Sequence, residues 1–498
     1  MSLSALPSQL YLCSQIRQAE LAMVQSTDVS LLQLVERAAH CAATTLSALC
    51  SLDKVLLLAG SGNNGSDALL MASLLTRRNI DCLVLRVQAN RYSDEHLAVM
   101  DMLSKTQVRV DELNESTLTK ALGEYDIVVD GLLGSGIQGI PRKDMMTYID
   151  MVNRAGRFVF SLDIPSGIDA DTGRIVGRAI AADATLCLGA VKRGLLTCDA
   201  RDCCGQLYFG DIGLAPFLPD AAAVSCDLNL LTEKLPPRRR NSHKGSHGKV
   251  CVVGGDRGMV GAVRLASEAC LRAGAGLVCV ISRQEHLPLV CASRPELMFH
   301  GCELVDMEAY HKLGWADVLV VGPGLGTDDW GYNLMKAVAL ANKPILLDAD
   351  GLNLLASEAD YSDMRVITPH PAEAARLLDC STAEVQNDRF AAAQKLQQIY
   401  GGVVVLKGAG TIIYDGNTLC VAPVGNPGLA SGGCGDVLSG IIGALMAQGL
   451  DLMSAAVAGV IIHGGAADLA AASGERGMLA TDLMTGIRKL VNPCMIQD

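Results

Sequence analysis

The stretch Val55–Asp67 reads Val-Leu-Leu-Leu-Ala-Gly-Ser-Gly-Asn-Asn-Gly-Ser-Asp, an apolar run followed by a glycine-rich turn. A short, continuously apolar run is typical of a strand that is buried on both faces. The turn leads into Ala68–Arg78, which has helical character, and Cys82–Val87 and Asp94–Ser104 repeat the strand and the helix. Apolar strands that alternate with helices predict a parallel sheet covered by helices on both faces.

The same rhythm continues to about residue 162 and restarts after a linker. The linker, residues 214–249, contains four prolines and a run of arginines, and this change of composition marks a domain boundary. Strands are then expected at 249–253, 277–281, 318–321, 345–347, 366–368 and 403–406, with a hairpin of 411–414 and 418–421. We therefore expect two three-layer α/β domains, residues 1–225 with a Rossmann-like parallel sheet and residues 226–498.

The composition of the 498 residues excludes several classes of protein. Half of the residues are hydrophobic and 19% are charged, which rules out a mainly disordered chain. The formal charge of −12 argues against general binding to nucleic acid or to acidic membranes. We expect no secretion signal and no membrane span: Ala455–Ala467, which His463 interrupts, is predicted as a buried helix, and the protein as cytoplasmic.

The 18 cysteines are predicted to be reduced thiols. None forms a Cys-x-x-Cys pair, and many lie inside apolar runs such as Leu186–Leu188 and Val250–Val252. Buried cysteine in a reducing compartment fits this pattern better than a disulfide scaffold or a zinc ribbon.

The glycine turn after the first strand fits Gly-x-Gly-x-x-Gly, a pattern of dinucleotide-binding folds. A nicotinamide-dependent dehydrogenase would carry an acidic side chain at the carboxyl end of its second strand to bind the ribose. Asp81 instead precedes that strand, and Asp67 would compete with a diphosphate for the free N–H groups of the helix. The sequence therefore disfavours a dehydrogenase, which remains a third hypothesis.

Polar side chains follow three strands of the first predicted sheet. They are Asn63, Asn64 and Asp67 after the first strand, Asp130 after 127–129, and Asp163 and Ser166 after 158–162. Because the carboxyl ends of parallel strands share one edge, these groups are expected to converge there. Carboxylate, amide and hydroxyl oxygens suit an alkali or alkaline-earth cation and not zinc. The alternative is that each residue only caps a helix or a turn.

The strongest signal of the second half is Gly425–Gly440, which reads Gly-Asn-Pro-Gly-Leu-Ala-Ser-Gly-Gly-Cys-Gly-Asp-Val-Leu-Ser-Gly. Gly432, Gly433 and Gly435 leave backbone N–H groups free at the start of an expected helix, where a phosphoryl group can bind. Asp436 in the first turn is suited to accept the proton of a hydroxyl that attacks phosphorus. The alternative is an ordinary acidic residue at a helix N-terminus.

Three other loops follow strands of the second half. They are 321–327, which is rich in glycine, 368–373, in which His370 lies between two prolines, and Lys407–Thr411. A rigidly held His370 suits contact with a ligand, although a lone histidine is more often structural, and His463 is expected in the core. Gly248-Lys249 lacks the Ser or Thr of a P-loop and lies within a strand, so that motif is excluded.

Gln33–Ala39, Ala59–Asp67, Val129–Gly136 and Leu162–Ile168 resemble the N-terminal domain of NAD(P)H-hydrate epimerases. The resemblance implies a potassium site at Asn64, Asp130 and Ser166, substrate contacts in the three loops and a catalytic Asp163. The implied substrate contacts are Asn63, Asn64, Gly65, Ser66, Asp67, Gly134, Ser135, Gly136, Ile137, Gln138, Gly139, Ile140 and Asp163.

This chain departs from the epimerase pattern at Ser66 and Ala68, where that family has glycine. A glycine would either supply a positive φ or let the backbone approach a ligand closely. We expect the first case, with about 1 kcal/mol of strain at Ser66 and an active epimerase.

In the second half, His243–Lys249, Val253–Gly255, Val321–Gly326, Thr368–Glu373, Val405–Gly408 and Asn426–Gly440 resemble the ribokinase-like superfamily, closely its ADP-dependent NAD(P)H-hydrate dehydratases. The resemblance implies hydrate contacts at Gly261, Gly324, His370 and Asp436, with Asp436 as the catalytic residue. The implied nucleotide contacts are Lys407, Gly408, Ala409, Gly410, Thr411 and Gly435.

Together the two resemblances imply a bifunctional repair enzyme. The first domain would interconvert the R and S forms of hydrated NADH and NADPH, and the second would dehydrate the S form with ADP, giving AMP and phosphate. They imply K⁺ in the first domain and Mg²⁺ with ADP in the second, and we expect a homo-oligomer. The rival hypothesis is a ribokinase-like small-molecule kinase whose first domain only binds.

Overall fold

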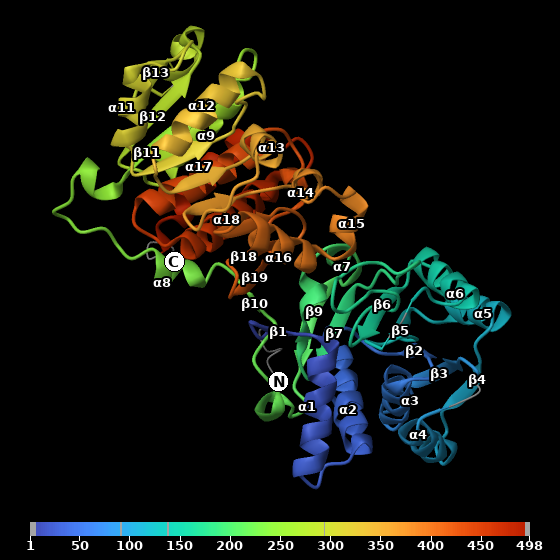
Figure 1. The fold of residues 1–498 in the computed structure, drawn as a ribbon. Coiled ribbons are helices and arrows are strands. Elements are labelled where there is room, and N and C mark those ends of the chain that lie inside the picture. Colours follow the sequence, from blue (N-terminus) through green and yellow to red (C-terminus); the bar gives the residue numbers. More distant parts are fainter. Residues whose placement is uncertain (1–5, 90–91, 137–138, 293, 494–498) are drawn as a thin grey trace. The chain divides into compact units, whose positions relative to one another are not determined.

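The computed structural model describes residues 6–89, 92–136, 139–292 and 294–493 (Figure 1). The contacts within the chain divide it into two compact parts, Met1–Ser225 and Cys226–Asp498, here called unit 1 and unit 2. Each contains a mainly parallel sheet between helices, so the predicted three-layer α/β class is confirmed.

Unit 1 is built on a wholly parallel sheet in the order β4-β3-β2-β5-β6-β7-β9. Its strands are β2 (Lys54–Ala59), β3 (Asp81–Arg86), β4 (Arg109–Glu112), β5 (Ile127–Gly131), β6 (Phe158–Leu162), β7 (Ala184–Leu188) and β9 (Gln206–Gly210). Its helices are α1 (Cys13–Ser26), α2 (Leu31–Leu49), α3 (Asn63–Thr76), α4 (Asp94–Ser104), α5 (Glu115–Glu124), α6 (Lys143–Arg154) and α7 (Ala200–Cys203). Three short strands lie outside this sheet: β1 (Gln9–Tyr11) pairs with β8 (Val191–Lys192) in parallel and with β10 (Ala223–Ser225) in antiparallel orientation.

The two faces of this sheet carry separate apolar cores. Helices α1, α2, α3 and α4 bury their apolar side chains on one face, and α5 and α6 bury theirs on the other. Successive side chains of a strand point to opposite faces, so the uninterrupted apolar run of β2 contributes to both cores. The parallel register aligns Ala59 of β2 with Gly131 of β5, and Asp130 with Ser161 of β6. The turns after these strands therefore lie at one edge.

Unit 2 contains a sheet in the order β13-β12-β11-β14-β15-β16-β17-β18-β19, parallel up to β17 and antiparallel beyond it. Its strands are β11 (Lys249–Val253), β12 (Leu277–Ser282), β13 (Met298–Gly301), β14 (Val318–Val321), β15 (Ile345–Leu347), β16 (Arg365–Ile367), β17 (Val403–Leu406), β18 (Thr411–Tyr414) and β19 (Leu419–Ala422). The hairpin of β18 and β19 turns at Asp415–Asn417, where Asp415 accepts hydrogen bonds from the next backbone N–H groups, as the sequence predicts.

The α-helices of unit 2 lie between residues 230 and 490. They are α8 (Leu230–Lys234), α9 (Val260–Arg272), α10 (Leu287–Cys291), α11 (Met307–Trp315), α12 (Asp329–Leu340), α13 (Asp350–Ser357), α14 (Pro371–Leu377), α15 (Thr382–Asn387), α16 (Arg389–Tyr400), α17 (Cys434–Ala447), α18 (Leu452–Ala470) and α19 (Leu483–Leu490). Helix α17 lies against α9, α18 and the strands β11, β14 and β15. This packing holds the start of α17 at the carboxyl edge of the sheet.

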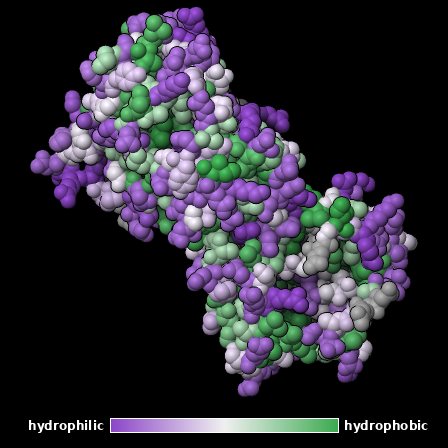
Figure 2. Space-filling view, in the orientation of Figure 1, coloured by the Kyte–Doolittle hydropathy of each residue, from purple (hydrophilic) through white to green (hydrophobic). Residues whose placement is uncertain are grey.

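The surface shown in Figure 2 is largely hydrophilic, with apolar residues scattered in small groups. The segment Leu452–Ser473 is long and apolar enough to cross a membrane by length and composition alone, but most of it is buried inside the fold. The cysteines in the described part of the chain are free thiols, most of them buried.

Candidate active sites

The glycine turn of unit 1 is required by close packing of backbone against backbone. A Cβ atom at Gly60 would lie 1.9 Å from the carbonyl oxygen of Leu132, and one at Gly65 would lie 2.0 Å from that of Gly60. No side chain fits at either position without moving the backbone. These glycines allow the turn after β2 to pack against the loop after β5.

The three residues of the predicted potassium site are brought together around Leu133. The Asn64 Nδ2 group donates to the Leu133 carbonyl at 2.9 Å, and the Leu133 N–H donates to Ser166 Oγ at 2.8 Å. Ser166 in turn donates to Asp130 from both Oγ, at 2.5 Å, and its backbone N–H, at 2.8 Å. Ser161 adds a bond to the same carboxylate at 2.9 Å.

The donor set at Asn64 fits a bound monovalent cation. The Asn64 Oδ1 atom is buried, and within the described ranges it has no hydrogen-bond partner. A buried carbonyl oxygen without a partner is unfavourable, and a cation would satisfy it. Burial raises the pKa of Asp130, while hydrogen bonds from Ser166 and Ser161 lower it, and a neighbouring cation would further favour the ionised form.

Asp163 is held in a strained conformation next to a buried lysine. Its φ of 64° lies in the left-handed region, which is costly for a residue with a side chain. Its carboxylate accepts a hydrogen bond from Lys192 Nζ and one from the Leu188 N–H at 3.2 Å. Lys192 is almost fully buried, and although burial opposes it, the charge of Asp163 raises the pKa of the lysine.

Two more acidic groups face this ion pair. Asp67 is buried, and burial together with the charges of Asp163 and Glu20 raises its pKa well above the usual value. Burial also raises the pKa of Glu20, which lies on α1. Sequence reasoning missed Lys192 and Glu20. Lys192 could have been predicted from the sequence, because Gly189–Lys192 follows the end of a strand at the same edge of the sheet.

The structure overturns the expectation of a positive φ at Ser66. Ser66 lies inside α3, has no positive φ, and is fully buried. Its Oγ lies 2.9 Å from Nδ1 of His96 on α4 and 3.3 Å from the carbonyl of Gly62. The helix extends back to Asn63, five residues earlier than predicted, so position 66 needs no glycine conformation. The side chain is directed to a neighbouring helix.

The loop after β5 is exposed where the substrate contacts are predicted. Ser135, Gly136, Gly139 and Ile140 are exposed, and Gly134 is half-buried. Ile137 and Gln138 lie outside the described residues.

In unit 2, the glycine loop ends where α17 begins. Gly433 is the N-cap of α17 with φ 90°, a left-handed conformation that glycine adopts at little cost. The first N–H groups of a helix have no intrahelical partner, so this start could bind an anion. In the described part of the chain, no hydrogen bond to the Asp436 carboxylate is found. Burial and the negative charge of Asp348 raise the pKa of Asp436 to about 7, while Lys407 opposes this.

Lys407 and Asp348 form a buried pair below the start of α17. Lys407 Nζ lies 2.8 Å from Asp348 Oδ1 and 3.8 Å from a carboxylate oxygen of Glu373. The other oxygen of Asp348 accepts a hydrogen bond from Ser439 Oγ at 2.7 Å. Although burial opposes it, the ammonium of Lys407 holds the pKa of Asp348 below its usual value. Sequence reasoning named Lys407 but missed the partners Asp348, Glu373 and Ser439.

His370 caps helix α14 and is thereby fixed in one tautomer. Its Nδ1 accepts hydrogen bonds from the N–H groups of Ala372, at 3.1 Å, and Glu373, at 3.3 Å. A ring nitrogen that accepts two bonds carries no proton, so the neutral ring carries its proton on Nε2. The side chain is 46% exposed. The Nε2 atom lies 3.4 Å from a carboxylate oxygen of Glu373, so the partly exposed ring both caps the helix and faces this carboxylate.

The predicted nucleotide loop Lys407–Thr411 is supported from below by Arg389, which sequence reasoning missed. The buried guanidinium of Arg389 donates to the carbonyl of Ala409 at 2.8 Å and to that of Leu406 at 3.1 Å. These bonds to carbonyl oxygens fix the backbone of the loop. Gly408 and Gly410 have positive φ, as glycines in such a loop should.

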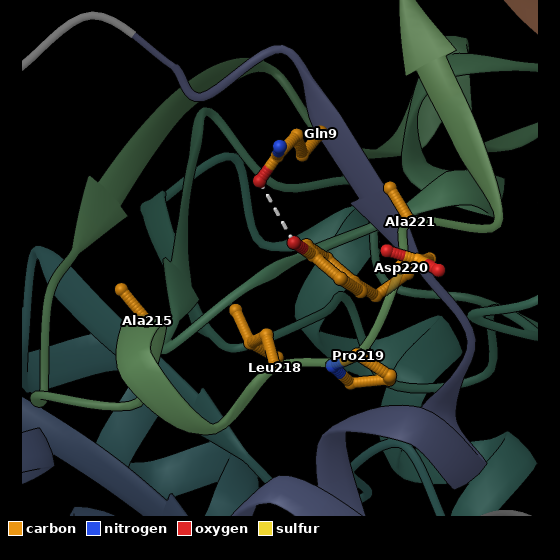
Figure 3. A pocket seen from close by; sticks show the side chains of 7 residues that line it. Gln9, Ala215, Leu218, Pro219, Asp220 and Ala221 are labelled. Atoms are coloured by element: carbon orange, nitrogen blue, oxygen red, sulfur yellow. Dashed lines mark hydrogen bonds between the residues drawn. The ribbon is translucent and has the colours of Figure 1, made fainter.

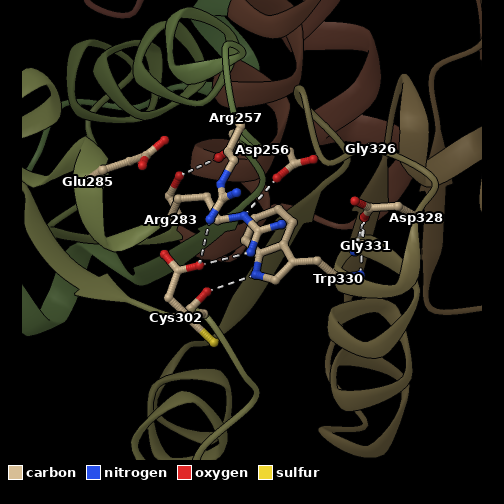
Figure 4. Close-up of polar contacts among 12 residues, drawn as sticks. Asp256, Arg257, Arg283, Glu285, Cys302, Gly326, Asp328, Trp330 and Gly331 are labelled. Atoms are coloured by element: carbon tan, nitrogen blue, oxygen red, sulfur yellow. Dashed lines mark hydrogen bonds and ion pairs between the residues drawn. The ribbon is translucent and has the colours of Figure 1, made fainter.

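Of the two remaining predicted hydrate contacts of unit 2, Gly261 lies in the first turn of α9, and Gly324, in the loop after β14, packs against Met259 just before that helix. A Cβ atom at Gly324 would lie 2.7 Å from that of Met259, and the carbonyl of Gly324 accepts the Asp256 N–H at 2.6 Å. Asp256 accepts a hydrogen bond from Arg283 at 2.7 Å (Figure 4). The guanidinium of Arg283 also lies 4.2 Å from the centre of the Trp330 ring. This cluster fixes the loop that leads to Gly261.

A shallow pocket of unit 1, shown in Figure 3, lies elsewhere. It is lined by Gln9, Tyr11, Ala215, Leu218, Pro219, Asp220 and Ala221, none of which is a candidate site residue. Tyr11 donates to Gln9 across it at 2.9 Å. Among the described residues, no group of three His, Cys, Asp or Glu side chains could hold a metal ion.

Comparison with known proteins follows the same division. The family description NAD(P)H-hydrate dehydratase matches residues 250–489, and YjeF-related protein N-terminus matches residues 31–194. A ribokinase-like superfamily protein from Enterococcus faecalis V583, known from a crystal structure, is 29% identical, with a TM-score of 0.50; the match covers 53% of this chain and 94% of that one.

Two curated relatives match almost from end to end. The bifunctional NAD(P)H-hydrate repair enzyme of Escherichia coli (strain K12) is 43% identical, and the match covers 98% of this chain and 95% of that protein. The enzyme of the same name from Coxiella burnetii is 44% identical, with 97% and 99% covered. The chain therefore belongs to the family of bifunctional NAD(P)H-hydrate repair enzymes.

Proposed function

We propose that the protein restores hydrated NADH and NADPH, with unit 1 as the epimerase and unit 2 as the ADP-dependent dehydratase. The observation that carries the proposal is Asp436, a carboxyl group with a pKa of about 7 in the first turn of a helix that has a free, glycine-rich start. A proton acceptor next to an anion hole is what transfer of a phosphoryl group to a hydroxyl requires.

The hydrate carries a hydroxyl group on the carbon next to the ring nitrogen, and hydroxide is a poor leaving group. In unit 2, Asp436 takes the hydroxyl proton as the oxygen attacks the terminal phosphorus of ADP, and AMP departs. The lone pair of the ring nitrogen then expels phosphate, and loss of a proton from the neighbouring carbon restores the dihydropyridine. The N–H groups at the start of α17 and the Lys407 ammonium stabilise the phosphoryl group.

In unit 1, the same hydroxyl leaves without phosphorylation. Burial and the charges of Asp163 and Glu20 raise the pKa of Asp67, which favours its protonated form, and this form can deliver a proton to the departing oxygen. The ring nitrogen forms a double bond to the carbon, and a water molecule then adds to the opposite face. The Asp163–Lys192 pair, which faces Asp67, lies where the carboxylate can take the proton of that water.

Two ions enter the proposal. Asn64, Asp130 and Ser166 would hold K⁺, which supplies a fixed positive charge beside the substrate loops. The free Oδ1 atom of Asn64 supports this assignment. Mg²⁺ is proposed only as the ion that accompanies the phosphates of ADP, without an assigned protein ligand.

The test is incubation of the full chain with the mixed epimers of the hydrate and ADP. We expect recovery of NADH absorbance together with release of free phosphate, and complete conversion of both epimers. The rival hypothesis, a kinase that retains the phosphoryl group on its product, predicts consumption of ADP without free phosphate or NADH. Replacement of ADP by ATP in a parallel reaction determines which nucleotide is used.

We also expect the protein to act in the cytoplasm as a homo-oligomer. Free, mostly buried thiols support a reducing compartment. Light scattering of the purified chain measures its assembly.

A further inference from the structure

Asp348 occupies a junction in unit 2 that the dehydratase chemistry described above does not use. It follows β15 directly, it is almost fully buried, and its two carboxylate oxygens bind different elements. One oxygen accepts from Lys407, at the end of β17, and the other accepts from Ser439, in the second turn of α17. A single buried carboxylate therefore joins the lysine to the helix that carries Asp436.

The backbone directly after Asp348 is strained, and this conformation fixes the direction of the Asp348 side chain. The next residue, Ala349, has φ 48° and ψ −119°, a conformation that costs free energy for any residue with a side chain. The bend separates two carboxylates: Asp348 is directed to Lys407, while Asp350 accepts the N–H of Gly326 at 2.9 Å. Strain of this kind persists only where surrounding contacts over-determine it.

We propose that Asp348 is a positioning residue of the dehydratase: it orients the Lys407 ammonium toward the phosphoryl site and locks that lysine to helix α17. The inference rests on the proposed function of unit 2. Gly435 lies directly above the pair, since a Cβ atom there would be 3.4 Å from Lys407 Nζ and 3.7 Å from Asp348 Oδ2. The pair is thus adjacent to the backbone that forms the anion hole.

The charge of Asp348 has a second consequence, for Asp436. Removal of this negative charge takes away the largest electrostatic contribution that raises the pKa of Asp436, and leaves the opposing charge of Lys407 uncompensated. His463 packs against the start of α17 and stays neutral, because burial lowers its pKa to about 4. The ionisable groups that face Asp436 are Asp348 after β15, Asp350 on α13, Glu373 on α14, Lys407 after β17 and Cys434 on α17 itself, whereas His463 on α18 contacts the Cys434 carbonyl.

The decisive variant is Asp348→Asn in the full chain, assayed with the S hydrate and ADP over a range of pH. We expect kcat to fall about 100-fold, because a displacement of a catalytic or binding group by about 1 Å can cost that much in rate. We also expect the acidic limb of the rate profile to move down by about one pH unit, because Asp436 loses its proton more easily. A purely structural defect would lower the rate without moving the limb.

Two further variants keep the test decisive. Ser439→Ala removes one bond from Asp348 but keeps its charge, so we expect a loss of a few-fold and an unmoved limb. If Asp348→Asn does not fold, a Ser439→Ala chain that keeps the full wild-type rate overturns the positioning role. Asp360→Asn is the matched control, since Asp360 forms a carboxylate–arginine pair with Arg365 at 2.7 Å in the same unit and lies outside the site.

The outcomes separate the inference from the function on which it rests. Circular dichroism and thermal unfolding of the same preparations report whether unit 2, which carries the substitutions, is folded. A wild-type chain without ADP-dependent dehydration overturns the proposed function. An active wild type together with a folded Asp348→Asn chain that keeps its rate and its pH limb overturns the positioning role. The positioning role is also overturned if Ser439→Ala moves the limb as far as Asp348→Asn does.

Discussion

The two candidate sites use a lysine–aspartate pair in opposite ways. In unit 1, Lys192 pairs with Asp163, the residue predicted to act on the substrate. In unit 2, Lys407 pairs with Asp348, and the acting residue, Asp436, has no hydrogen bond within the described part of the chain. Both pairs stand at the carboxyl edge of a parallel sheet. The difference is that in unit 1 the lysine contacts the carboxylate predicted to act, whereas in unit 2 it contacts a second carboxylate and not the acting one.

The consequence is chemical. In unit 1, the Lys192 ammonium contacts the carboxylate that is proposed to take a proton from water. In unit 2, burial and the negative charge of Asp348 raise the pKa of Asp436 to about 7, so this group can take and release a proton at neutral pH. The following predictions test this contrast.

The largest expected effect is that of Asp436→Asn on dehydration. The amide keeps the size of the side chain but cannot accept a proton, and loss of general-base assistance typically costs ~10²–10⁴ in rate. Single-turnover formation of NADH from the S hydrate and ADP measures it. Epimerisation and nucleotide binding should be unchanged in the same chain. A variant that dehydrates at a near-normal rate would remove Asp436 from its role.

The next effect is that of Asp163→Asn on epimerisation. The variant keeps the shape of the side chain but removes the negative charge that Lys192 binds, and we expect a rate about 100-fold lower. Interconversion of the separated epimers, followed by chromatography, is the measurement. Dehydration of the S form should be unaffected. If epimerisation survives while Lys192→Met abolishes it, the lysine and not the carboxylate is the acting group.

The contrast also predicts different pH dependence for the two activities. Asp436 must be ionised to accept a proton, so kcat/KM for dehydration should rise about tenfold per pH unit below pH 7 and level off above it. Asp436→Asn should lack this limb. A dehydration profile that is flat from pH 5.5 to 8 would contradict the raised pKa.

A smaller effect is expected from the cation site of unit 1. Replacement of K⁺ by a bulky organic cation should slow epimerisation about tenfold, because the buried Asn64 Oδ1 atom would lose its only proposed partner. Asn64→Ala should be slow in both media and indifferent to the exchange. Dehydration should not respond to the exchange in either protein. Equal epimerisation with and without K⁺ would refute the site.

The sequence predicts much of this molecule because its signals are local. Apolar runs and glycine turns indicate the strands and their edges, and Asp130, Ser166 and Asn64 meet where the parallel topology requires. Asp348 and Arg389 could not be assigned, because their roles come from contacts between separate elements of the chain, such as the bond between Asp348 and Ser439, which are 91 residues apart. The role of a buried charged side chain cannot be read from the sequence unless the residue that pairs with it is known.

The smallest effect concerns Ser66, where local reasoning failed. Position 66 lies one turn inside α3, so glycine is not needed for its backbone, and the Ser66 hydroxyl is bonded to buried His96. Ser66→Gly would lose that bond and place glycine inside a helix, which together cost ~1–2 kcal/mol of stability. Because the side chain is directed to α4 and not to Asp163, epimerisation should change by less than about tenfold, or ~1.4 kcal/mol.

Thermal unfolding and epimer interconversion of wild type, Ser66→Gly and Ala68→Gly test this directly. Ala68 is the matched control, since it lies in the same helix and its side chain makes no polar contact. We expect Ser66→Gly to lower the unfolding temperature more than Ala68→Gly does, with the rates of both close to that of the wild type. Epimerase activity that appears only in the glycine variants would mean that Ser66 blocks the substrate, and that unit 1 of the natural chain binds without catalysis.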